Sequence, residues 1–219
     1  PGRTDFRFQR LSVMLCLEWA LNRGVARFDG SQQGPDPGEP REFATFEDVW
    51  QAFEVQLGVM VERVVRGVIE RGDDRAGIAP VPLLSALTDG AIEQRRDLTA
   101  GGAKFRTYGM LAEGASHAID SLSAIKRIVF DEGKVTIREL IDAINDDYEG
   151  HDSVRRLMHT APSYGCDEPA ADEIGQRLIG AFCNAVELCA AENDSEVKFP
   201  CGVGTFSWYI GIGQGLGAS

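Results

Sequence analysis

Long apolar runs are absent from this sequence of 219 residues, in which no stretch of 18 or more consecutive apolar residues occurs. A helix that crosses a bilayer needs about 20 such residues, so the pattern excludes a membrane-spanning helix. No signal-peptide pattern opens the chain. We therefore expect no membrane partner.

Basic residues are scarce relative to acidic ones, with 22 Lys and Arg against 34 Asp and Glu and a formal net charge of −12. An acidic surface favours solubility, and it repels the phosphates of a nucleic acid. We therefore expect no nucleic-acid partner.

Cysteine and histidine are few and scattered. No Cys-x-x-Cys pair occurs, and an odd number of cysteines in a chain of this length argues against a disulfide framework. His151 and His159 have no acidic residue at ligand spacing on a shared face, so we expect no metal site. We expect every cysteine to be a small buried apolar residue, namely Cys16, Cys166, Cys183, Cys189 and Cys201.

Apolar residues recur mostly at steps of three and four, which predicts a largely helical chain with two or three strands. The longest such pattern follows a capping box formed by Thr45 and Asp48. That is the composition of an α/β protein. The expected helices are 9–22, a long one from 46 to just before 72, 83–94, 136–145, 153–159 and 169–191, and the expected strands are 104–108 and 203–212.

The stretch from Leu98 to Phe130 organises these elements. Gly101-Gly102 predicts a tight turn, since glycine permits positive φ and close backbone approach. A short strand, a loop over 109–116 and an amphipathic helix opening near His117 are expected to follow. A glycine-rich loop before a helix start is a plausible pocket wall.

The residues of this stretch also resemble a known family. GGAKF, followed by DSLSAIKRIVFDEGKVT, is similar to the glycyl radical enzymes of the pyruvate formate-lyase-like superfamily. The resemblance extends to LSALTDGAIEQRRDLTAGGAKF upstream and to the helical segment that ends in Ser163-Tyr164-Gly165-Cys166-Asp167, where many members have Lys-Tyr-Gly-Asn-Asp. It covers most of residues 11–219.

The resemblance implies a mostly helical slice of a ten-stranded α/β barrel with few strands. It further implies a radical stored on a backbone glycine, which a cysteine receives as a thiyl that attacks a small-molecule substrate. An S-adenosylmethionine-dependent iron–sulfur activase would generate that radical in an anaerobic cytoplasm. Whether the protein forms a homodimer is left open.

Neither radical motif of the family, Gly-Cys-x-Glu or Arg-Val-x-Gly-Tyr/Phe, is complete here. Cys16-Leu17-Glu18 has the cysteine–glutamate spacing, but Leu15 precedes it and the segment has helical periodicity. We therefore expect Cys16 to be a core thiol and keep Cys16 with Glu18 as the alternative catalytic pair. The segment from Gly202 to Phe206 faintly resembles the radical glycine motif, but it lacks the arginine of that motif, so we do not expect it to carry the radical.

Two residues are candidates for a substrate pocket, Glu113 in the expected loop and His117 at the helix start. Each could bind or shuttle a proton, and the alternative is a surface glutamate and a histidine that bonds the backbone. Asp120 and Lys126 match the family's DSLxAIK run, and we expect them to anchor the helix.

The domain assignment is that residues 1–219 form part of one pyruvate formate-lyase-like domain truncated at both ends. No Met opens the chain, and it stops in the glycine-rich run GIGQGLGAS. We expect a fragment of a radical lyase, decarboxylase or dehydratase that is inactive alone. The alternatives are a non-catalytic helical binding or scaffold module and a radical-free paralogue.

Overall fold

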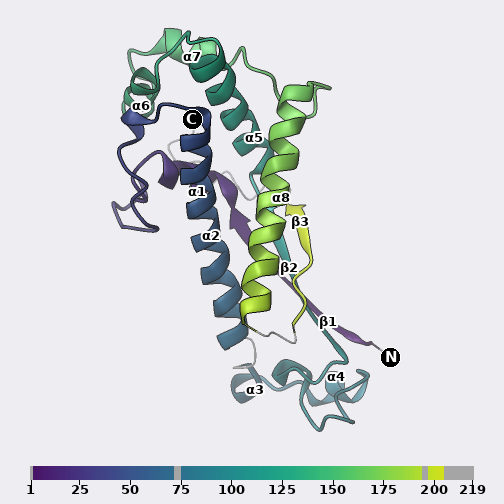
Figure 1. Ribbon diagram of the computed structural model, residues 1–219. Helices are drawn as coiled ribbons and strands as arrows, with labels where there is room; N and C mark the ends of the chain where they lie inside the picture. The colour runs from purple at the N-terminus through teal and green to yellow at the C-terminus, as the bar shows by residue number, and fades with distance from the viewer. Residues whose placement is uncertain (1, 72–74, 194–196, 205–219) are drawn as a thin grey trace. The chain divides into compact units, whose positions relative to one another are not determined.

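The computed structural model describes residues 2–71, 75–193 and 197–204. Its larger elements alternate between helices and a few strands, and Figure 1 labels them. These are β1 (Thr4–Ser12), α1 (Val13–Ala20), α2 (Phe46–Arg71), α3 (Arg75–Ile78), α4 (Pro82–Ala86), β2 (Phe105–Glu113), α5 (Ala115–Ala124), α6 (Ile137–Asn145), α7 (Asp152–Met158), α8 (Pro169–Glu192) and β3 (Cys201–Gly204). Short 3₁₀ turns span Pro40–Glu42 and Leu98–Ala100. The α/β prediction is confirmed.

Most of the expected elements are present, and four of them differ in their bounds. Residues 9–12 are the end of strand β1 rather than the start of a helix, because tertiary strand pairing overrides a weak local pattern. The expected helix over 83–94 ends at Ala86, and Gly90, at φ +100°, lies in the turn that follows. Residues 109–113 continue β2 instead of forming a loop. The expected strand over 203–212 begins two residues earlier, and its part beyond Gly204 lies outside the described residues.

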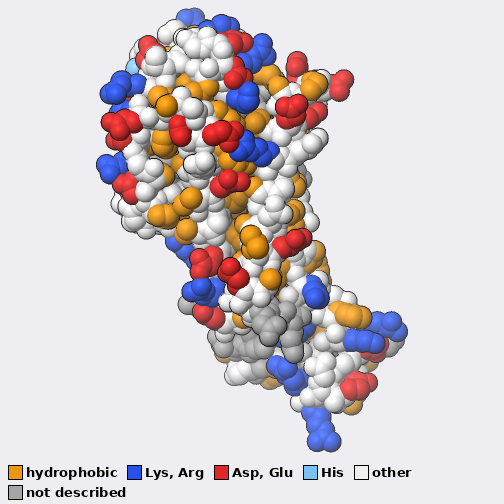
Figure 2. All heavy atoms as spheres, viewed as in Figure 1, with side chains coloured by type: hydrophobic (Ala, Val, Ile, Leu, Met, Phe, Trp, Pro, Cys, Tyr) orange, Lys and Arg blue, Asp and Glu red, His pale blue; other side chains and the backbone are white. Residues whose placement is uncertain are grey.

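The chain divides into two compact units. One comprises residues 1–11, 61–111 and 183–203, and the other comprises residues 12–60, 112–182 and 204–219. We call them the sheet unit and the helical unit. Figure 2 shows Lys and Arg side chains interspersed with Asp and Glu over the visible face.

The sheet unit holds most of a small sheet of strand order β1-β2-β3. A parallel bridge joins Thr107 to Lys198, and the Tyr108 N–H donates to the Lys198 carbonyl at 2.8 Å. Tyr108 packs with Val68 and Val197 in a buried cluster. Its hydroxyl accepts a 2.7 Å hydrogen bond from Arg7 Nη1, so the polar end of a buried ring is satisfied.

The glycine pair adopts the turn that the sequence predicts. Gly101 has φ +85°, in the left-handed region that glycine favours. Gly102 lies against backbone, and a Cβ at this position would be 2.1 Å from the Arg96 carbonyl oxygen. One glycine therefore supplies the conformation and the other permits the close approach.

Asp97 ties the turn before this glycine pair to the start of α4. Its carboxylate accepts hydrogen bonds from the backbone and hydroxyl of Thr99, from the Ser85 hydroxyl and from the Val81 N–H at 2.6–3.0 Å. These bonds favour the charged form, so they lower the pKa of Asp97 to about 2.

Asp97→Asn should therefore change how stability depends on pH. A carboxylate with a depressed pKa stabilises the fold above the pKa of about 3.9 that Asp has when unfolded, and this contribution is lost as the pH falls toward 2. We expect the variant to be less stable than wild type at pH 7, with the gap closing on acidification. Urea unfolding of both proteins at several pH values measures the difference in their free energies of unfolding. A gap that stayed constant from pH 7 to pH 2 would contradict this assignment.

The helical unit is built on α1, α5, α6, α7 and the first turns of α2 and α8. The Thr45 hydroxyl accepts from the Asp48 N–H, and Asp48 Oδ2 accepts from the Thr45 N–H at 2.7 Å, so the expected capping box is confirmed. A second box, Thr136 with Glu139, opens α6. Helix α1 packs against α5, and α6 contacts α7 and the 3₁₀ turn at Pro40–Glu42.

Helix α5 passes into a π-helical segment, Ile125–Asp131. Its ion pairs join residues five apart, Lys126 with Asp131 at 2.7 Å and Arg127 with Glu132 at 2.8 Å. The wider π turn brings side chains at this spacing onto one side of the helix. The sequence gives no sign of this segment, because residues 125–130 suit an ordinary α-helix equally well.

Candidate functional site

Glu113, a candidate pocket residue, lies at the carboxyl end of β2. Only 2% of its surface is exposed, so the surface-glutamate interpretation is wrong. A Cβ placed on Gly204 would be 2.7 Å from Glu113 Cγ and 3.0 Å from Oε1, so the carboxyl group lies directly against the Gly204 backbone. Gly114, at φ +70°, then turns the chain into α5.

A cavity of about 540 Å³ lies within the helical unit. Its volume falls in the range of small-molecule sites, which commonly combine apolar walls with a few polar groups. The apolar lining comes from α1, from the α5–π-helix junction, from α6 and from the end of α7. It includes Met14, Leu17, Leu21, Ile125, Leu140, Ile144 and Met158.

Glu18 and Arg27 form the half-buried polar part of this lining. Glu18 Oε1 accepts a 2.9 Å hydrogen bond from the Arg27 backbone N–H, and Arg27 Nη2 donates to Asn145 Oδ1 at 2.8 Å. Burial raises the pKa of Glu18, while the hydrogen bond from Arg27 opposes the rise. Burial also lowers the pKa of Arg27. Both charges are thus incompletely solvated.

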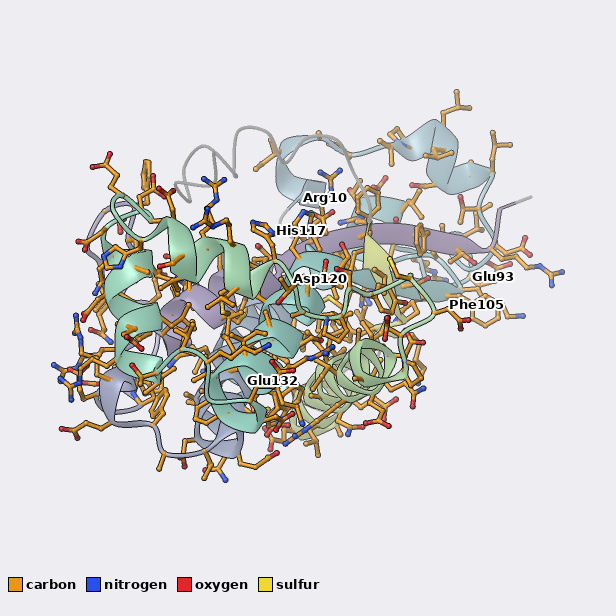
Figure 3. The ribbon with its side chains drawn as sticks, turned by 90° about the horizontal axis from the view of Figure 1, so that it is seen from above. Arg10, Glu93, Phe105, His117, Asp120 and Glu132 are labelled. Carbon is orange, nitrogen blue, oxygen red and sulfur yellow. The ribbon has the colours of Figure 1, made fainter. Side chains whose placement is uncertain are left out.

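His117 and Asp120 line the cavity from α5, one helical turn apart (Figure 3). His117 Nδ1 lies 3.5 Å from the Ser116 hydroxyl. Asp120 Oδ1 accepts a 2.7 Å hydrogen bond from the Tyr164 N–H. This bond joins Asp120-Ser121-Leu122 to the run from Ser163 to Asp167. Both stretches resemble the family, and they are far apart in the sequence.

The turn after α6 brings strained backbone to the cavity wall. Asp147 and Tyr148 have φ values of +50° and +60°, which are uncommon for residues other than glycine. Both line the cavity, and burial raises the pKa of the Tyr148 hydroxyl. Backbone strain of this kind gathers at functional sites, where the surrounding structure maintains it.

Cys16 lies outside this lining. Its side chain is fully buried, with Sγ 3.7 Å from the Ser12 carbonyl oxygen and 3.7 Å from Met60 Sδ. Burial raises the pKa of its thiol to about 12. A thiol in this environment stays protonated and is a poor nucleophile.

The other four cysteines differ in how exposed their side chains are. Cys189 is buried, as expected, and Cys183 and Cys201 are half-buried. Cys166 is exposed, so the expectation of burial is wrong for this residue. It lies in a turn where Gly165 and Asp167 both have positive φ, and connecting segments of this kind run over the protein surface.

The structure therefore brings together only part of what the sequence selected. His117 and Glu18 share one cavity, whereas Glu113 and Cys16 do not line it. Sequence reasoning missed Arg27, Tyr148 and Arg155, which come from a loop, a turn and a surface helix. No periodic signal marks such positions. Positive φ at two non-glycine residues was not visible in the sequence.

The described residues contain no candidate metal-ligand group and no candidate membrane-spanning helix. Residues 2–71, 75–193 and 197–204 contain no group of three His, Cys, Asp or Glu side chains arranged to hold a metal ion. Over the same residues, none of the helices combines the length and apolarity that crossing a bilayer requires.

Comparison with known proteins identifies the family. Residues 1–213 match the model of the pyruvate formate lyase-like family. The chain is 33% identical over 177 residues to trans-4-hydroxy-L-proline dehydratase of Clostridioides difficile, a match covering 80% of this chain and 22% of that protein. It is 30% identical over 167 residues to isethionate sulfite-lyase of Bilophila wadsworthia, covering 74% and 20%.

A solved structure agrees with this assignment. A glycyl radical enzyme from Archaeoglobus fulgidus matches with a TM-score of 0.76 and 28% identity, over 88% of this chain and 24% of that one. The chain belongs to the pyruvate formate lyase-like family, and the Archaeoglobus fulgidus protein that it resembles is a glycyl radical enzyme. It spans about a fifth to a quarter of the length of the proteins it matches.

Proposed function

We propose that this chain is a segment of a longer glycyl radical enzyme, a dehydratase or another lyase that acts on a small organic substrate. The observation that carries the proposal is the family match over residues 1–213. The curated relatives are a dehydratase and a sulfite-lyase, and each is four to five times as long as their shared region. The barrel, in this proposal, is completed by other parts of the same polypeptide.

Both radical centres are proposed to lie outside this segment. Cys16 is the alternative within it, paired with Glu18 at the spacing of the family motif. A thiyl donor needs access to substrate, whereas Cys16 is fully buried against Met60 and keeps its proton. Glu18 turns to the cavity and Cys16 to the core, so the pair does not act on one molecule. Cys16 is a structural residue in this proposal.

Glu113 is the proposed contribution of the segment to the substrate pocket. It ends the central strand of the sheet, and catalytic groups in α/β proteins commonly stand at strand carboxyl ends. A carboxylate with 2% exposure is held away from bulk water, which suits proton transfer. His117, on α5 and exposed, is proposed as a second polar residue of the pocket wall.

The proposal implies specific partners. The radical would be generated by an S-adenosylmethionine-dependent iron–sulfur activase in an anaerobic cytoplasm, and the substrate would be a small molecule rather than a membrane or nucleic acid. No cofactor is assigned to this segment itself, and the assembly into a homodimer is left to solution measurement.

The test uses the full-length protein encoded by the gene, incubated anaerobically with its activase and S-adenosylmethionine. We expect a glycyl radical signal by electron paramagnetic resonance and turnover of a small hydroxylated or sulfonated substrate. Cys16→Ala should keep both. Glu113→Gln should keep the radical signal but lower turnover by about 10²-fold or more, the usual loss when a general acid or base is removed.

Three other results would each count against the proposal. Turnover lost in Cys16→Ala, with the radical signal and fold intact, would restore the alternative pair. Wild-type turnover in Glu113→Gln would leave Glu113 a structural residue. A gene that encodes neither radical motif around this segment would favour a radical-free paralogue or a non-catalytic scaffold module.

A further inference from the structure

The cavity of the helical unit has a polar side that the proposed radical chemistry does not use. Glu113 and Cys16 are not part of its lining. All of its lining residues belong to the helical unit, so the description of the site does not depend on how the two units are placed. An inference about this cavity therefore stands or falls separately from the proposed function.

The two half-buried carboxylates of the lining, Glu18 and Asp120, already accept hydrogen bonds. Glu18 accepts from the Arg27 N–H and Asp120 accepts from the Tyr164 N–H. Asp147, the third, is exposed and keeps its hydration. These acidic groups therefore offer a ligand little that is unused.

The two guanidinium groups are in the opposite situation. Arg27 is half-buried near the Glu18 carboxylate, and the hydrogen bond that its Nη2 donates to Asn145 goes to a neutral amide and leaves other N–H donors. Arg155 is exposed and makes no ion pair or side-chain hydrogen bond to any of the described residues, and it lies close enough to Tyr148 to influence the charge of that hydroxyl. An anion bound here would give Arg155 an ionic partner and would add a second one, beside Glu18, to Arg27.

We propose that this cavity binds a small organic anion with an aliphatic body, whose carboxylate is held by Arg27 and Arg155 and whose chain lies on the apolar wall formed by residues such as Leu17, Ile125 and Leu140. The volume of about 540 Å³ accommodates such a molecule with its head toward the polar side. Tyr148, whose backbone has φ +60°, lies in the same wall.

The histidines provide a direct reporter of occupancy. The chain has three, of which His117 and His159 line the cavity and His151 does not. His151 instead pairs with Asp146 at 3.0 Å. Titrating the 219-residue protein with octanoate should move the imidazole resonances of His117 and His159 in nuclear magnetic resonance spectra and leave those of His151 almost unchanged.

The head-group requirement is tested with matched probes and variants. Octanoate should bind at least tenfold more tightly than 1-octanol or octylammonium at equal chain length. Arg27→Gln and Arg155→Gln should each remove most of that preference. Arg156→Gln, the adjacent exposed arginine on α7 that does not line the cavity, should bind octanoate like wild type.

Each other outcome overturns the inference. Equal affinity for octanoate and octanol would show a merely apolar cavity, and tighter binding of octylammonium would assign the site to cations. Shifts confined to His151, or no binding at all, would show that octanoate does not enter. If an arginine variant fails to fold, the wild-type histidine shifts and the three-probe comparison still decide.

Discussion

Replacing Trp50 with alanine is expected to lower the free energy of unfolding by about 3–5 kcal/mol, the usual cost of truncating a buried aromatic side chain. Trp50 is 1% exposed on α2, and its ring packs at 6.4 Å from that of Phe46 and 5.5 Å from that of Phe53. The Arg177 guanidinium lies 4.0 Å from the ring centroid. Truncation would remove all three contacts and leave a cavity.

Two matched variants separate packing from other effects. Trp50→Phe keeps an aromatic ring and removes an indole N–H that has no hydrogen-bond partner among the described residues, so it should cost much less. Val55→Ala, at an exposed position on the same helix, should change stability by less than about 0.5 kcal/mol. Urea unfolding measures all three, and a loss below about 1 kcal/mol in Trp50→Ala would contradict the packing described.

Gly102→Ala is expected to be the second most damaging substitution, at about 3 kcal/mol, near the upper end of ordinary single-site effects. The new Cβ would lie 2.1 Å from the Arg96 carbonyl oxygen and 3.0 Å from that of Asp97. Both obstacles are backbone atoms, so no side-chain rotation relieves the contact. The turn before β2 must then open.

The control for this prediction is a glycine with room around it. Gly58 lies within α2, and a Cβ there meets nothing within 4 Å. Gly58→Ala should stabilise the protein by roughly 0.5–1 kcal/mol, because alanine has the higher helix propensity. Thermal unfolding of both variants gives the comparison, and equal effects at the two positions would show that close approach does not explain Gly102.

The candidate site shows where sequence reasoning stops. His117 and Glu18 were selected from separate motifs, and only folding placed both on one cavity. Glu113 was expected in a loop but ends a strand, because pairing with strand neighbours extends β2 beyond the residues that look β-forming. Arg27 and Arg155 are 128 positions apart, and no local pattern links a loop residue to one on α7.

Local interactions determined much of this protein from the sequence alone. The capping boxes at Thr45 and Thr136, the apolar face of α8 and the left-handed turn at Gly101 depend on neighbours a few residues away, so their patterns are sufficient. Contacts distant in sequence decided the rest. Strand pairing made residues 9–12 and 109–113 part of β1 and β2. Burial keeps the Cys16 thiol protonated, and packing brought residues distant in sequence together around one cavity. Those outcomes depend on free energies shared among residues far apart in the chain, which no local window contains.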